Sequence, residues 1–255
     1  MGKRARWLVA ALALAGCGNE PVDWDVPVSA PADTMGGLSV EGTSVAFVRP
    51  LTRTTLPADS ARCGHSEALA TDGSDTYATW LRRRANGSVL VVAARSIDGG
   101  SSWSNAAIAD SVDVGRSGCD HPAPSIAASA GYVHIAYSLD APEGFGVFFA
   151  HSMDQAATFH SPIPVIYGDR LSRATVTADG MRVVVAYEDP SGAGHRVDVA
   201  ISNTQGHSFE RRMHGSPDDV EAARPEAALG GNTVAVSFGP PAAAGPRTVR
   251  IGHLR

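Results

Sequence analysis

Two cysteine–histidine pairs are the residues whose types and spacing point most directly to chemistry. Cys63 lies 33 residues before Ser96 (96 − 63), and Cys119 lies 33 residues before Ser152 (152 − 119). A histidine stands two positions after each cysteine: His65 and His121. The N-terminal signal described below indicates export, and paired cysteines of an exported chain usually form a disulfide. This disulfide is the pairing that we expect. The alternative is a metal site built from all four side chains, because thiolates and imidazoles are ligands for zinc.

Two arginines share one equivalent position among the internal repeats described below. The repeats are aligned on the aromatic residues that end four apolar runs: Trp80, Tyr137, Tyr187 and Phe238. The alignment brings four residues to one position: Glu67, Ala123, Arg173 and Arg224. The planar fork of a guanidinium group matches a carboxylate, so Arg173 and Arg224 could bind an acidic ligand. Alternatively, both arginines are solvated or paired with Glu67, Asp169 and Glu226.

Other charged residues lie close in sequence to this position. Together with the two arginines they form one candidate binding site near the axis of the fold: Arg173, Arg224, Glu67, His65, His121, Asp120 and Arg170. Asp169 lies beside them. We name no catalytic residue among them, and we expect no cofactor.

A turn sequence, Ser96-Ile-Asp-Gly-Gly-Ser-Ser-Trp103, organises the elements that must position these side chains. It follows the β-branched run 89–95, so it indicates a tight turn at the end of a strand. The glycines allow positive φ angles, and Asp98 can accept hydrogen bonds from backbone N–H groups further along. Trp103 can fold over the turn and shield it from water.

Two weaker copies of this turn follow. Ser152-Met-Asp-Gln-Ala-Ala-Thr-Phe159 has Ala156 where Gly100 stood, and Ser202-Asn-Thr-Gln-Gly-His-Ser-Phe209 has Thr204 in place of the aspartate. The copies begin 56 and 50 residues apart (152 − 96 and 202 − 152). A period near fifty residues, with several short strands in each, is typical of β-propeller blades.

The turn pattern resembles the Asp box, or BNR repeat, of sialidases and related β-propellers. The resemblance implies a structural role for the residues that match it: Ser96, Asp98, Gly100, Trp103, Ser152, Asp154, Phe159, Ser202, Gly206 and Phe209. It also raises the question of catalysis, because sialidases use a tyrosine nucleophile with three arginines. This chain offers two aligned arginines, and Tyr137 and Tyr187 lie at strand ends. In Tyr187-Glu188-Asp189, neighbouring strand residues point to opposite faces and cannot converge.

We therefore predict an all-β fold: a small β-propeller of about four blades, each of four antiparallel strands. The repeats run from Cys63 to Asp113, from Cys119 to Ile166, from Asp169 to Gly215, and from Ala222 to the C-terminus. The last repeat lacks its outermost strand. We expect an N-terminal strand, supplied by the run Leu38–Val48, to complete that blade and cover its edge.

The N-terminus has the features of a bacterial lipoprotein signal. Residues 1–6 are basic, residues 7–14 are apolar, and Leu14-Ala-Gly-Cys17 matches a lipobox. Lipidation of Cys17 would anchor the protein to a membrane of the cell envelope, in the outer membrane or at the cell surface. Three parts follow from this: a signal peptide (1–17), a flexible tether (18–37) and the propeller domain (38–255).

The composition limits the function classes. The formal net charge is −5 and charged residues make up 18% of the chain, which argues against nucleic-acid binding. Two hypotheses remain. The first is a non-catalytic, membrane-anchored module that binds a glycan or an envelope protein. The second is an exo-sialidase-type glycoside hydrolase with a reduced set of arginines.

Overall fold

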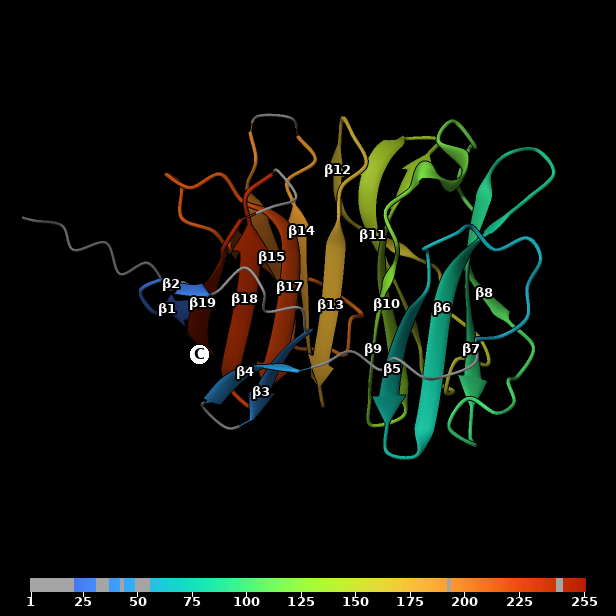
Figure 1. Cartoon of the computed structure of the whole chain (residues 1–255), viewed down its shortest axis with the longest axis horizontal. Helices are drawn as coiled ribbons and strands as arrows, with labels where there is room; N and C mark the ends of the chain where they lie inside the picture. Colours follow the sequence, from blue (N-terminus) through green and yellow to red (C-terminus); the bar gives the residue numbers. More distant parts are fainter. Residues whose placement is uncertain (1–20, 31–36, 42–43, 49–55, 192–193, 242–244) are drawn as a thin grey trace, which may run out of the picture.

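The protein is a small β-propeller in which four antiparallel sheets form the blades (Figure 1). The computed structural model describes residues 21–30, 37–41, 44–48, 56–191, 194–241 and 245–255. Within this part of the chain, no helix has the length and the apolarity that crossing a membrane requires. The fold class predicted from the sequence is confirmed.

The first two blades follow each other along the chain. Blade 1 has four strands: β5 (Ala68–Asp72), β6 (Asp75–Arg83), β7 (Val89–Ser96) and β8 (Ala107–Asp110). A short 3₁₀ helix, Gly118–Asp120, leads into blade 2. Blade 2 comprises β9 (Ser125–Ser129), β10 (Tyr132–Ala141), β11 (Gly144–Ser152) and β12 (Ile163–Gly168).

The last two blades use one segment from the other end of the chain. Blade 3 comprises β13 (Ala174–Asp179), β14 (Arg182–Glu188), β15 (Val197–Ser202) and β16 (Arg211–His214). Blade 4 has β17 (Ala223–Gly230), β18 (Thr233–Gly239) and β19 (Arg247–Leu254). Its outer edge is completed by β1 (Val22–Trp24) and β2 (Val28–Ala30), which both pair with β19.

An N-terminal strand therefore completes the last blade, but the segment differs from the expected one. Leu38–Val48 does not pair with β19; it contributes to a separate hairpin of β3 (Gly37–Glu41) and β4 (Ser44–Val48) that packs against β17 and β18. Strands β1 and β2 lie within residues 18–37, which the sequence assigned to a tether. Val22 explains the difference, because its side chain is 1% exposed and joins the apolar core of blades 3 and 4.

The hydrophobic core lies between successive blades. The innermost strands pack in the order β5, β9, β13 and β17, and β3 follows β17. One apolar cluster joins blades 1 and 2, a second joins blades 2 and 3, and a third joins blades 3 and 4. Figure 1 shows the blades side by side, with β1 and β2 next to β19. We call the end where β13 begins and β14 ends the upper end, and the opposite end the lower end.

The three serine turns all lie at the lower end, each between the third and fourth strands of a blade. In each turn the serine hydroxyl accepts a hydrogen bond from the backbone N–H four residues later, at Gly100 (2.7 Å), Ala156 (2.9 Å) and Gly206 (2.9 Å). Asp98 and Asp154 accept further bonds from the backbone N–H groups of Ser102 and Thr158, both 2.8 Å long. The turns are thus closed by their own side chains.

The turns differ in what their fifth residue touches. A Cβ atom on Gly206 would lie 2.4 Å from the ring of Phe149 in blade 2, so this turn of blade 3 tolerates only glycine. The corresponding Ala156 has φ +66° and is buried in the cluster between blades 1 and 2, which contains Ala93 at the position of Phe149. The second turn can therefore hold Ala156 in place of glycine, because blade 1 has the small Ala93 where blade 2 has Phe149.

The third turn can be strengthened by restoring its aspartate. Thr204 receives the backbone N–H of Ser208 at 3.2 Å, whereas Asp98 and Asp154 receive the equivalent bond at 2.8 Å. We expect Thr204→Asp to raise the free energy of unfolding by about 0.5–1.5 kcal/mol, because an ionised acceptor makes the stronger bond. Urea unfolding measures this change, and an unchanged or lower stability would contradict it.

The contribution of Asp98 in the first turn to the free energy of unfolding should depend on pH. Hydrogen bonds from Ser102 and Ser96 lower the pKa of Asp98 to about 2, below its usual 3.8. The folded state therefore gains stability above the unfolded pKa and loses it as the pH falls through the folded value. The stability difference between the native chain and Asp98→Ala should be constant above about pH 5 and shrink towards pH 2.

Candidate functional site

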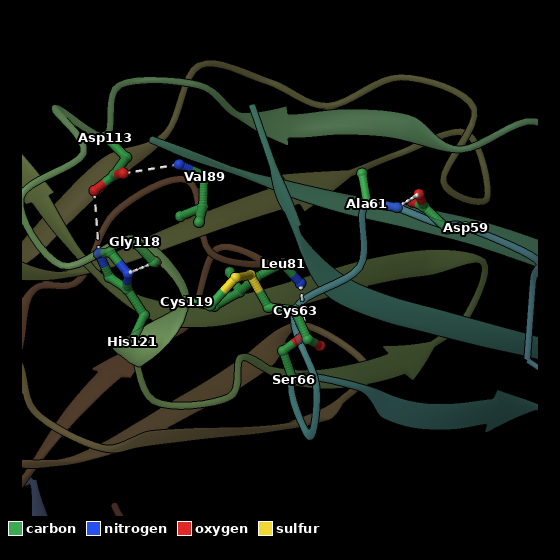
Figure 2. Close-up of a disulfide and its surroundings, with 10 residues drawn as sticks. All are labelled: Asp59, Ala61, Cys63, Ser66, Leu81, Val89, Asp113, Gly118, Cys119 and His121. Atoms are coloured by element: carbon green, nitrogen blue, oxygen red, sulfur yellow. Dashed lines mark hydrogen bonds and ion pairs between the residues drawn. A yellow bond between two sulfur atoms is a disulfide. The ribbon is translucent and has the colours of Figure 1, made fainter. Parts of the chain in front are cut away.

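A disulfide between Cys63 and Cys119 joins the segments that lead into blades 1 and 2 (Figure 2). Their Cα atoms are 5.3 Å apart, and Cys63 is 1% exposed. Ser66 supports the bridge: its hydroxyl donates to the carbonyl of Cys63 (2.7 Å) and accepts from the N–H of Leu81 (3.1 Å). The disulfide takes both sulfur atoms, so the alternative metal site with His65 and His121 does not form.

His121 is held inside the protein by an ion pair with Asp113. Its Nε2 lies 3.0 Å from Asp113, and its Nδ1 donates to the carbonyl of Gly118 (2.7 Å). Figure 2 shows the ring directed at the carboxylate, which also accepts the N–H of Val89 (2.8 Å). Although burial by itself disfavours charge, the bonds to Asp113 and Gly118 raise the pKa of His121, and the bond from His121 lowers the pKa of Asp113.

The candidate residues around the disulfide thus separate into two groups. His121, one of the predicted binding residues, is held by Asp113 and Gly118, and these bonds fasten the segment before blade 2 to blade 1. His65, Glu67 and Asp120 are exposed on the segments that lead into the blades.

Arg173 and Arg224 are brought together through Glu188, which ends β14 at the upper end. One carboxylate oxygen of Glu188 accepts the backbone N–H of Arg224 at 2.7 Å, and the other accepts that of Arg173 at 3.4 Å. Glu188 therefore joins the starts of the innermost strands of blades 3 and 4. The side chain of Arg173 is exposed.

Strand β17 begins with a bulge at Arg224. Its pairing with β18 shifts between Ala223 and Glu226, and Arg224 has φ +55°, which is uncommon for a residue with a side chain. The guanidinium of Arg224 donates to the carbonyl of Pro240 (3.1 Å). Bulges beside a sheet's end often redirect a side chain towards a functional site.

Arg247 stabilises this bulge from the third strand of blade 4. It donates to the carbonyl of Arg224 (2.9 Å) and to the hydroxyl of Ser237 (2.7 Å), and it lies 3.7 Å from the carboxylate of Glu226. Burial raises the pKa of Glu226 and lowers that of Arg247. Glu226 thus pairs with Arg247, which the sequence alignment did not select.

A polar hollow of about 450 Å³ lies beside this cluster at the upper end. Its walls come from the β14–β15 connection, from the end of β16 and from the loop before β17: Asp189, Gly194, His195, Arg196, His214, Pro217, Asp218, Asp219, Val220 and Glu221. Arg196 bridges Asp189 (2.7 Å) and Asp198 (3.1 Å). The hollow therefore has fixed cationic and anionic groups in its wall.

Arg170 holds the rim of this hollow in place. Its guanidinium donates to the carbonyls of Asp189 and Gly194, both at 3.0 Å. Asp189 is buried, and although burial opposes ionisation, hydrogen bonds from Ser191 and the charge of Arg196 lower its pKa. The loop 217–222 connects the hollow to Arg224, because it lines the hollow and leads directly into β17. It is fixed to the other wall where the N–H of Ala222 donates to the carbonyl of His195 (2.8 Å).

The two tyrosines that the sequence placed at the ends of second strands are buried, although Tyr137 lies in the middle of β10 and only Tyr187 lies near the end of its strand. Tyr137 is 1% exposed and donates to Asp110 (2.6 Å), and burial raises its pKa well above the usual value. Tyr187 is also 1% exposed, and burial raises its pKa as well. Among the described residues, no tyrosine lines the hollow.

Comparison with solved structures agrees with this fold. The Hadza microbial sialidase Hz136 has a TM-score of 0.50 at 15% identity, and the match covers 69% of this chain and 42% of that chain. The catalytic domain of the Coprinopsis cinerea GH62 α-L-arabinofuranosidase has a TM-score of 0.49 at 12% identity, covering 85% and 71%. The phage phi92 endosialidase has a TM-score of 0.49 at 7% identity, covering 73% and 35%.

At these identities the likeness shows the β-propeller fold alone. The chain spans less than half of the length of the sialidase Hz136. No protein-family model matches the chain, and no curated protein sequence matches it.

Removal of the disulfide should destabilise blades 1 and 2. The bridge closes a loop between residues 56 positions apart, and a crosslink of that span contributes about 4 kcal/mol in the chain-entropy estimate. We expect a paired Cys63→Ser and Cys119→Ser variant to lose about 2–4 kcal/mol of unfolding free energy in urea. Reductant should destabilise the native chain but leave the variant unchanged; equal stability of the two oxidised proteins would contradict the prediction.

Proposed function

We propose that this chain is a non-catalytic binding module, exported and anchored by lipid, whose β-propeller holds a polar ligand such as a glycan. The observation that carries this proposal is the hollow at the upper end of blade 3, with carboxylates, arginine and histidines in one wall. Sugar hydroxyls donate to carboxylates and accept from guanidinium and imidazole groups, so a wall of both kinds suits them.

The wall is also held rigid before any ligand arrives. Arg196 is fixed between Asp189 and Asp198, and His214 lies 2.8 Å from Asp198. Asp218, Asp219 and Glu221 are exposed on the opposite loop. A fixed wall reduces the entropy that binding must overcome, and the exposed loop offers groups that can contact the ligand.

The serine turns support the resemblance to Asp-box β-propellers. We infer that they are Asp-box repeats, because all three use the serine hydroxyl to accept the N–H four residues later. They lie at the lower end, away from the hollow, and so have a structural role.

A second candidate function is a sialidase-type hydrolase. Arg247 favours it, because it adds a third arginine beside Arg224 and Glu226. Burial of Tyr137 and Tyr187 favours the binding module instead, because a tyrosine nucleophile must reach its substrate.

The two functions separate in one set of assays. We expect the unlipidated chain from Gly18 onward to bind glycans on an array, and a paired Asp218→Asn and Asp219→Asn variant to lose at least tenfold in affinity. Both side chains are exposed, so these changes leave the core intact. Asp25→Asn, at an exposed position between β1 and β2, is the matched control and should bind as the native chain does.

Turnover of a fluorogenic sialoside would contradict the binding-module proposal. In that case Arg224→Ala should abolish the activity, because the arginine would bind the substrate carboxylate. Glycan binding that ignores the Asp218→Asn and Asp219→Asn changes would place the ligand elsewhere and would also contradict the proposal.

The anchor rests on the sequence Leu14-Ala-Gly-Cys17, which lies outside the described residues. In cells that process lipoproteins, we expect Cys17 to incorporate labelled palmitate and the protein to sediment with membranes. Cys17→Ser should abolish the label and release the protein from the membrane fraction, because the acyl chains supply the affinity. A Cys17→Ser variant that sediments as before would contradict the lipid anchor.

A further inference from the structure

Three histidines meet at the lower end, between blades 2 and 3. His151 is near the end of β11, His160 follows the second serine turn, and His207 lies within the third. One ring nitrogen from each lies within 4.8 Å of the others. The histidines and the hollow lie at opposite ends of the blades. The end of β15 at Ser202 pairs with the start of β14 at Val183, at the lower end, whereas the start of β15 at Val197 pairs with Glu188, at the upper end beside the hollow.

The backbone fixes the spacing of these rings. The N–H of His160 donates to the carbonyl of His151 (3.0 Å), so the two side chains form a cross-strand pair with ring centroids 4.6 Å apart. The ring of His207 comes from the neighbouring blade and lies 4.5 Å from that of His151. Its position is set by the close contact of Gly206 with the ring of Phe149.

The hydrogen bond of His207 leaves its other nitrogen available. Nδ1 lies 2.6 Å from the carbonyl of Thr204, which can only accept, so Nδ1 carries the proton and Nε2 keeps its lone pair. A backbone carbonyl that orients an imidazole in this way is a common feature around bound metals.

His151 has a buried nitrogen without a partner. The residue is 6% exposed, and its Nε2 makes no hydrogen bond. A buried polar atom left without a hydrogen-bond partner is costly, and a ligand at this point would recover that cost.

We propose that His151, His160 and His207 form a binding site for one zinc ion, which joins blades 2 and 3. Three imidazoles are a complete protein ligand set for zinc that keeps one position open. Around a tetrahedral ion the three nitrogens lie roughly 3.3 Å apart, given Zn–N bonds near 2.05 Å. His160 and His207 are exposed and can rotate to close the difference, and water fills the fourth position.

Blade 1 has the backbone geometry of this site without its histidines. In blade 1 the residues equivalent to His151 and His160 are Arg95 and Ser104, which are joined by the same backbone contact (Ser104 N–H to Arg95 carbonyl, 2.8 Å). The preceding blade therefore shares the backbone geometry but not the imidazoles.

Titration calorimetry of Zn²⁺ into the untagged full chain in detergent tests the site. We expect one equivalent to bind saturably, and His160→Gln and His207→Gln each to weaken binding by at least tenfold. Both positions are exposed, so glutamine there opens no cavity. His253→Gln, an exposed histidine on β19, is the matched control and should leave the affinity unchanged.

Cobalt gives a second readout that does not depend on affinity. Co²⁺ in a four-coordinate histidine site absorbs visible light strongly, and the paired His160→Gln and His207→Gln variant should lose this absorption while its circular dichroism stays native. Zinc should also raise the melting temperature of the native chain but not of the paired variant. Absence of one-equivalent binding by the native chain, or equal binding by the paired variant, would overturn the proposal.

Discussion

The structure depends on burying both faces of each sheet against its neighbours. Residues 77–81 of β6 and 183–187 of β14 are buried without interruption, so their successive side chains, which point to opposite faces, are all covered. A single such sheet would expose an apolar face to water, and only the adjacent blades can cover it. The serine turns, the disulfide and the pairing of β1 with β19 all act at places where one blade meets the next or where a sheet edge would remain open.

Much of this fold follows from the sequence. The period of the serine turns gave the blade boundaries, because the hydrogen bonds that close those turns are local and their residues can be recognised. The repeated spacing of Cys63 and Cys119 likewise gave the disulfide. The closing strand was wrong because Val22–Trp24 is a short segment next to prolines and acidic residues, and only its contact with the core of blades 3 and 4 makes it a strand. Such long-range pairing leaves no periodic signal in the sequence.

The candidate site was harder to predict, and for a different reason. Alignment placed Arg173 and Arg224 at one equivalent position, but Arg173 lies opposite Glu188, whereas the bulge in β17 puts Ala223 opposite Gly239 and shifts Arg224 out of that register. It also could not show that Glu188 binds the backbone of both arginines. Arg247 and the wall of the hollow come from connections that differ in length between blades, so the repeat gives no guide to them. The alignment also did not show that the carboxylate of Asp113, in the preceding loop, holds the ring of His121. The histidines at the lower end escaped notice because they come from two separate repeats.

The pairing of β1 with the C-terminal strand bears on how far the domain could stand from a bilayer. Only residues 18–21 separate Cys17 from β1, and a fully extended chain covers at most about 3.6 Å per residue. With acyl chains on Cys17, the segment between the lipid and β1 would span at most roughly 18 Å across its five peptide steps. The predicted tether of twenty residues, 18–37, could have reached roughly 70 Å. The outer edge of blade 4 would then rest near the lipid headgroups and restrict the orientations of the whole domain, so that its binding surfaces would sample a shallow layer above the membrane.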